Sequence, residues 1–144
     1  RLAAWHAAVR ATGLDADGDL VFEGDFQAAS GSAAVHRLFD LAEPPTALVA
    51  ADSLMTVGAI AMLTRLGLRI GTDVSLIGFD DVEWFSLLNP ALTVVGHNVD
   101  EMGRTAVQLL HAVIAGGVPA SVTLPSELIV RSSTSAPASS RTPS

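Results

Sequence analysis

Cysteine is absent from this 144-residue sequence. The absence excludes disulfide scaffolds, thiol catalysis and zinc sites built on cysteine. Long hydrophobic runs are absent too, because no stretch reaches the ~18 consecutive apolar residues of a membrane-spanning helix. We therefore expect no membrane as a partner of this chain.

Positive charge is scarce. The chain has no lysine, and its 8 basic residues stand against 15 Asp and Glu residues, which gives a net charge of −7. Domains that bind nucleic acid usually carry a basic face. The chain as given is therefore not expected to contact DNA itself.

The usual catalytic and cofactor signatures are missing. The sequence has no phosphate-binding loop, no dinucleotide-binding glycine motif and no nucleophile elbow around a serine. His97 has no other histidine or glutamate at a metal-ligand spacing, so a zinc site is rejected. We expect no catalytic residue, no metal ion and no cofactor.

Hydrophobic residues make up 49% of the chain, and their spacing changes between the two periods of regular secondary structure. Helices are expected at residues 1–12, 54–66 and 99–114. A further helix, with Ser30 or Ser32 as a possible cap, is indicated by the apolar stripe Val35, Leu38, Phe39 and Ala42. Short apolar runs predict strands at residues 20–22, 46–50, 74–79, 92–95 and 124–130. The run at 46–50 is typical of a strand that is buried on both faces.

This alternation predicts an α/β domain with a mainly parallel sheet flanked by helices. Residues 1–131 form one domain in this interpretation. Residues 132–144 are rich in Ser, Thr, Ala and Pro, so they are expected to be a disordered tail. Because residue 1 is Arg rather than Met, we favour a piece of a longer protein.

Polar residues follow several of the predicted strands, where ligands of such sheets bind. Asp52 and Ser53 are either a helix cap or side chains that face a ligand. Asp80 and Asp81 have several interpretations: a metal site, acid–base chemistry, acceptors for sugar hydroxyls, or a solvated turn.

Aromatic and apolar side chains near these strand ends are also candidates. Phe26 could stack on a ring-shaped ligand or belong to the core, and His97 could be a site residue or merely structural. A dense apolar segment beside the acidic pair predicts either core packing or a partner surface. Its members are Trp84, Phe85, Leu87 and Leu88.

Two sequence blocks are the most specific motifs of the chain. They are Gly78-Phe79-Asp80-Asp81 and Leu128-Ile129-Val130-Arg131-Ser132-Ser133-Thr134, and further blocks lie at residues 45–52, 67–70, 90–93 and 102–103. In this order and spacing they resemble the LacI/GalR (lactose/galactose repressor) family of bacterial transcription regulators. The resemblance covers roughly residues 1–134.

The resemblance implies that this chain is one part of a larger protein with several domains. Family members join a helix-turn-helix DNA-binding domain to a two-lobed effector domain similar to periplasmic sugar-binding proteins. This chain resembles the C-terminal part of the effector domain, an incomplete second lobe of the type I periplasmic-binding-protein-like fold. The implied partners are a sugar-like small-molecule effector, a second copy in a homodimer and, through a missing N-terminal domain, operator DNA. The implied location is cytoplasmic.

The resemblance also implies roles for particular residues. Arg1 falls on an arginine that clamps the effector, Phe26 on an aromatic that stacks on it, and Asp80 on an aspartate that accepts its hydrogen bonds. His97 falls on a polar position at the crossing into the first lobe. Asp52 falls where many members have Asn, which leaves the identity of the effector open.

The segment 82–88 and the helix 54–66 resemble the family's dimer interface. This favours the partner-surface interpretation for Trp84, Phe85, Leu87 and Leu88. Two other functions stay open: a solute-binding protein of an ABC-type sugar transporter, and an α/β enzyme that uses Asp80 or Asp81. A lobe that lacks strands of its own sheet has an exposed edge, so the isolated chain is expected to self-associate.

Overall fold

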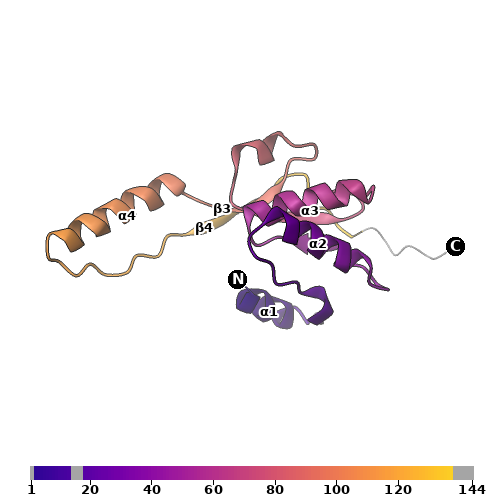
Figure 1. The fold of residues 1–144 in the computed structure, drawn as a ribbon, viewed down its shortest axis with the longest axis horizontal. Coiled ribbons are helices and arrows are strands. Elements are labelled where there is room, and N and C mark those ends of the chain that lie inside the picture. Colours follow the sequence, from indigo (N-terminus) through magenta and orange to yellow (C-terminus); the bar gives the residue numbers. More distant parts are fainter. Residues whose placement is uncertain (1, 14–17, 138–144) are drawn as a thin grey trace.

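The computed structural model describes residues 2–13 and 18–137 of the chain (Figure 1). The helices are α1 (Leu2–Ala11), α2 (Ala28–Phe39), α3 (Ser53–Arg65) and α4 (Val99–Ile114), and the 3₁₀ helices are η1 (Gly18–Leu20) and η2 (Glu83–Leu87). The strands are β1 (Ala47–Val49), β2 (Ser75–Phe79), β3 (Thr93–His97) and β4 (Ser126–Ile129).

The four strands form one sheet in the order β1-β2-β3-β4. The pairs β1–β2 and β2–β3 are parallel, whereas β4 runs antiparallel to β3. Ile77 lies opposite Thr93, and Val94 lies opposite Ile129. The sheet confirms the prediction of an α/β fold with mainly parallel strands.

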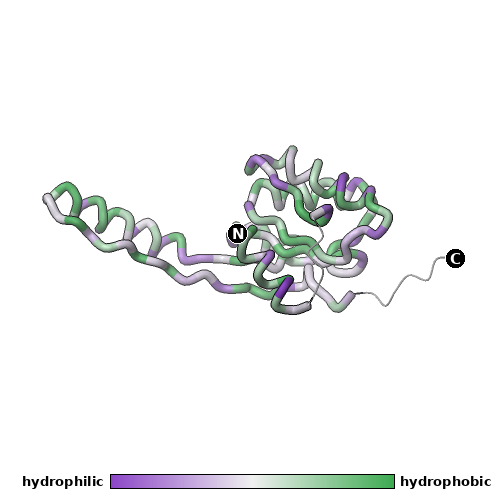
Figure 2. Tube along the Cα trace, turned by 90° about the horizontal axis from the view of Figure 1, so that it is seen from below, coloured by the Kyte–Doolittle hydropathy of each residue, from purple (hydrophilic) through white to green (hydrophobic). Residues whose placement is uncertain are grey.

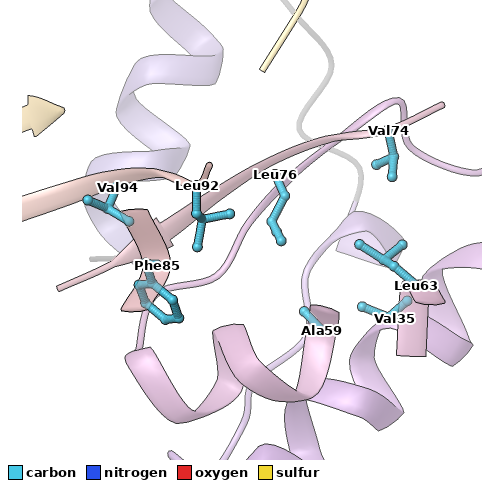
Figure 3. Packing of buried hydrophobic residues seen from close by; sticks show 8 residues of the cluster. All are labelled: Val35, Ala59, Leu63, Val74, Leu76, Phe85, Leu92 and Val94. Carbon is cyan, nitrogen blue, oxygen red and sulfur yellow. The ribbon is translucent and has the colours of Figure 1, made fainter. Parts of the chain in front are cut away.

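The core lies where α3, with α2 against it, meets the sheet and η2 (Figure 3). Leu76 and Gly78 of β2 are buried, whereas the alternate residues Ser75, Ile77 and Phe79 are half-buried, because successive side chains of a strand point to opposite faces. The buried hydrophobic cluster consists of Val35, Ala59, Leu63, Val74, Leu76, Phe85, Leu92 and Val94.

Phe85 corrects one expectation. The sequence favours a dimer-interface role for this residue, but its side chain is 0% exposed and belongs to the core. The short η2 helix turns Phe85 inward and leaves its neighbours Trp84 and Ser86 exposed. A side chain with no exposed surface does not contact a second subunit, so the interface interpretation is wrong for Phe85.

Two expectations about strands are also wrong. Residues 20–22 form no strand: Leu20 ends η1, and the next residues have no regular structure. The run at 46–50 forms β1, but β1 is an edge of the sheet rather than a strand buried on both faces, and Val49 is 59% exposed. In the described part of the chain, no strand lies beside the outer edge of β1, which is why β1 is covered on one side only.

The helix predicted at residues 99–114 is confirmed as α4, and the Asn98 side chain caps it by accepting the Glu101 N–H at 2.9 Å. α4 and the segment 115–125 that returns from it project from the body as an arm (Figure 1). No residue of α4 is buried. Hydrophobic residues recur along this arm (Figure 2), among them Val99, Met102, Val107, Leu110, Val113 and Ile114, all of them exposed.

Within the described residues, no helix combines the length and the hydropathy that crossing a membrane requires.

The disordered tail was predicted to begin at residue 132, but residues 132–135 are ordered. Ser133 is 0% exposed: its hydroxyl donates to the Leu76 carbonyl oxygen and accepts from the Thr93 N–H, both at 2.7 Å. The Ser135 N–H donates to the Ser75 hydroxyl at 3.1 Å. Residues 132–135 are therefore held against β2 and β3 by hydrogen bonds that composition alone does not reveal. Residues 138–144 lie outside the described part of the chain.

Removal of the Ser133 hydroxyl is expected to be costly. Ser133→Ala leaves the buried Thr93 N–H and the Leu76 carbonyl without this bridge, and we expect the free energy of unfolding to fall by roughly 2–4 kcal/mol. Urea denaturation of the purified chain measures the change. Ser135→Ala is the matched control, because Ser135 is exposed and its loss is expected to cost under about 0.5 kcal/mol. Equal effects of the two variants would contradict the prediction.

Candidate functional site

Three of the predicted site residues lie at one edge of the sheet. Asp52, Asp80 and His97 stand at or just beyond the carboxyl ends of β1, β2 and β3. These strands are parallel neighbours, so their carboxyl ends share that edge. This is the edge at which open α/β sheets bind ligands.

Asp80 and His97 are brought together by this arrangement. The Asp80 Oδ1 lies 3.6 Å from the His97 Nδ1, and both side chains are partly exposed. The Asp80 N–H donates to the Val95 carbonyl oxygen at 3.0 Å, which ties the residue to the end of β3. A carboxylate beside an imidazole offers a ligand two hydrogen-bond acceptors next to a group that both donates and accepts.

Phe26 is 60% exposed and lies just before α2, with a φ of 62°. A turn that involves Asp25 and Ser30 holds it: the Gln27 N–H donates to the Asp25 Oδ1 at 3.1 Å, and the Asp25 N–H donates to the Ser30 Oγ at 3.3 Å. The Ser30 side chain is also the main cause of a lowered pKa of the Asp25 carboxyl. The expectation that Phe26 offers its ring to a ligand stays a prediction.

Asp52 is the N-cap of α3, because its Oδ1 accepts the Met55 N–H at 3.0 Å. The cap interpretation of Asp52 is thus confirmed, and its role toward an effector stays a prediction. Arg1, which the resemblance implies as an effector clamp, lies outside the described residues.

Two open grooves meet at the base of the arm. One, of about 600 Å³, is lined by residues that include Asp81, His97, Asn98 and Glu127. The other, of about 510 Å³, runs along α4 and also includes His97 and Asn98. Asp80, Phe26 and Asp52 line neither groove. Of the predicted site residues, His97 is thus the one that connects the sheet edge to the arm.

Arg131 was not among the predicted site residues. It follows β4 and lies beside the start of β3, but its side chain reaches Asp81, which follows β2. Its guanidinium binds both carboxylate oxygens of Asp81, with the Nη1–Oδ1 and Nη2–Oδ2 distances both 2.8 Å. The hydrogen bond to Asp81 is the main cause of a raised pKa of Arg131. Both residues belong to the two most specific sequence blocks, but those blocks do not indicate that the two side chains pair.

The predicted dimer surface is divided by the fold. Leu87 is 78% exposed and Trp84 is exposed, whereas Leu88 is partly buried against the core. The Trp84 ring meets the buried Phe85 ring edge-on, with 4.4 Å between the centroids. Trp84, Leu87 and part of Leu88 therefore stay available for a partner surface.

No cluster of three or more His, Asp or Glu side chains suited to a metal ion occurs within the described ranges 2–13 and 18–137. The paired carboxylates Asp80 and Asp81 also do not act together. Asp80 faces His97, and Asp81 is bound by Arg131. A shared metal site or a paired acid–base centre is not what this geometry offers.

Comparison with known proteins relates this architecture to a family. Residues 1–134 match the model of the periplasmic binding protein-like domain. The transcriptional repressor CytR of Escherichia coli is 36% identical over 138 residues, which cover 94% of this chain and 40% of CytR. The lactose operon repressor of Escherichia coli is 33% identical over 138 residues, which cover 95% of this chain and 38% of the repressor.

Solved structures agree with these relatives. A LacI family transcriptional regulator from Mycobacterium smegmatis superposes with a TM-score of 0.83 at 32% identity, over 92% of this chain and 50% of that one. These relatives are transcriptional regulators rather than enzymes, and the chain spans about 40% of the length of the curated repressors. The chain belongs to the family of periplasmic binding protein-like domains, in the form found in LacI-type transcriptional regulators.

Proposed function

We propose that this chain is the C-terminal part of the effector-binding and dimerisation domain of a cytoplasmic, LacI/GalR-type transcriptional regulator. The observation that carries the proposal is the position of Asp80. It stands at the carboxyl edge of the parallel sheet, beside His97, at the base of a projecting arm. An ionised aspartate accepts hydrogen bonds only, which suits the hydroxyl groups of a sugar-like effector.

The exposed apolar residues of the arm support the proposal that this chain forms only one side of the effector cleft. Six large apolar side chains of α4 are exposed, an arrangement that soluble proteins rarely leave uncovered. In the proposal a first lobe, encoded outside this chain, packs on α4 and closes the effector cleft from the other side. The share of its relatives that the chain spans agrees with this division.

The proposed mechanism is a population shift. An effector held between the two lobes stabilises one interlobe arrangement, and this changes the affinity of a separate DNA-binding domain for its operator. His97 is the last residue of β3 and only Asn98 separates it from α4, so it would couple effector binding to the position of the arm. Two copies would associate through the exposed surface of Trp84 and Leu87 near α3.

The first test is the coding DNA upstream of the Arg1 codon, read in frame. A helix-turn-helix and a first lobe are expected there. A signal peptide followed by a first lobe would favour the solute-binding protein of a transporter. A start codon directly before Arg1 would overturn both of these functions.

The second test uses the full-length protein from that reading frame. Ribose, glucose, galactose and lactose are titrated by calorimetry, and binding of at least one is expected. Asp80→Asn is expected to weaken binding about tenfold to a hundredfold, because a hydrogen bond to a charged acceptor contributes about 1.5–3 kcal/mol. Asp40→Asn, an exposed position beyond the end of α2, is the matched control.

The outcomes separate the parts of the proposal. If no sugar binds while the protein still binds DNA, the sugar class is wrong. If Asp80→Asn and Asp40→Asn bind equally well, Asp80 is not an effector ligand.

A further inference from the structure

Two residues other than glycine have a positive φ in the described part of the chain: Phe26 at 62° and Asp80 at 66°. The left-handed region costs side-chain-bearing residues energy, and such residues persist only where their surroundings hold them. Both are among the residues that the resemblance places at the effector. The positive φ of Asp80 therefore requires neighbouring contacts that hold it.

The neighbour of Asp80 is firmly anchored. Asp81 binds Arg131 through both carboxylate oxygens at 2.8 Å, a fork geometry that fixes both direction and distance. Within this pair the Arg131 side chain is 18% exposed and that of Asp81 is 32% exposed, so water only partly screens the contact.

Arg131 is itself fixed to β3. Its Nη1 donates to the Leu92 carbonyl oxygen at 2.9 Å, and its backbone N–H donates to the Thr93 Oγ1 at 2.9 Å. The guanidinium therefore links Leu92, just before β3, to Asp81, in the turn after β2. The turn after β2 contains Asp80.

We propose that Arg131 is a positioning residue for effector binding. It acts through Asp81 to hold the Asp80 backbone in its left-handed conformation and the Asp80 carboxylate beside His97. This inference rests on the proposed function of Asp80. Without the Arg131–Asp81 ion pair, the φ of Asp80 relaxes toward a negative value, and the Asp80 carboxylate leaves the carboxyl edge of the sheet.

The role of the Arg131–Asp81 ion pair can be tested without an effector. The Asp80 N–H is bound to the Val95 carbonyl, so its hydrogen exchange measures whether the turn is held. In Arg131→Met, exchange at Asp80 is expected to accelerate at least about tenfold relative to the Leu76 N–H, which reports opening of the core. The Leu76 N–H donates to the Ser133 carbonyl at 2.9 Å and lies in the buried centre of the sheet.

Matched variants separate positioning from stability. Arg131→Lys keeps the charge but not the fork, so a smaller acceleration, about threefold, is expected. Arg69→Met breaks an exposed Arg–Asp pair of similar geometry, with Nε–Oδ2 at 2.9 Å to Asp73, and is expected to leave Asp80 unchanged. If Arg131→Met fails to fold, Asp81→Asn removes one charge of the pair and gives the same readout.

Three results bear on the inference. Preferential acceleration at Asp80 supports it. Equal acceleration at Asp80 and Leu76 shows a purely structural role and overturns it, and so does an unchanged Asp80 N–H.

A second experiment joins the inference to function. In the full-length protein, Arg131→Lys is expected to raise the Kd for the sugar that binds by about tenfold, with a melting temperature within 2 °C of that of Arg69→Met. An unchanged Kd overturns the inference. If no sugar of the panel binds, the proposed effector class fails, while the exchange result still decides whether Arg131 holds the turn.

Discussion

Gly58→Ala is expected to lower the free energy of unfolding by about 3 kcal/mol or more. A Cβ at this position of α3 would overlap the Ala28 carbonyl oxygen and come too close to the Ser32 nitrogen of α2. Both are backbone atoms, so no side-chain rotation relieves the overlap. The Ser32 hydroxyl also donates to the Gly58 carbonyl at 2.9 Å, which holds the two helices at this separation.

Thermal unfolding followed by circular dichroism measures the effect. For a chain of this size the loss corresponds to a melting temperature lower by roughly 10 °C. Gly103→Ala is the matched control, because it is also a glycine-to-alanine change within a helix, but no atom lies within 4 Å of the added Cβ. It is expected to cost nothing and to strengthen α4 by about 1 kcal/mol. A Gly58→Ala variant as stable as Gly103→Ala would show that α2 and α3 do not pack this closely.

Val49→Lys is expected to weaken self-association of the isolated chain at least about tenfold, because charged side chains protect exposed sheet edges from pairing. On the β2 side, the Ala50 N–H donates to the Ile77 carbonyl, and the Thr46 carbonyl accepts the Ser75 N–H. Alternation along the strand then directs the backbone groups of Ala47 and Val49 away from β2. These groups form an open edge that a second copy can extend.

Sedimentation velocity over a range of chain concentrations measures the association. The unmodified chain is expected to form dimers or larger species, and Val49→Lys to shift the distribution toward the monomer. Leu87→Lys is the matched control, since it places the same charge on the exposed η2 surface. Dissociation by Leu87→Lys alone would assign the contact to that surface instead. A monomeric unmodified chain at high concentration would show that the edge is not adhesive.

Much of the candidate site could be predicted from the sequence. Strand ends mark where ligands bind in α/β sheets. Asp52, Asp80 and His97 all follow predicted strands, and the structure places them at one edge. The pairing of Asp81 with Arg131 could not be predicted, although both residues stood in recognised motifs. They are 50 positions apart, and the pairing of β2 with β3 and of β3 with β4 brings them into contact.

The order of most helices and strands, the α/β class and the family could be predicted from the sequence, because periodicity and motifs are local properties of the chain. Which of these elements are covered depends on contacts between distant segments, so it could be read only from the folded chain. Phe85 is core rather than interface, β1 is an edge, and α4 stands free, since burial depends on what packs against an element. Ser133 is held in the same way, by bonds to residues 40 and 57 positions away, and composition carries no record of such contacts.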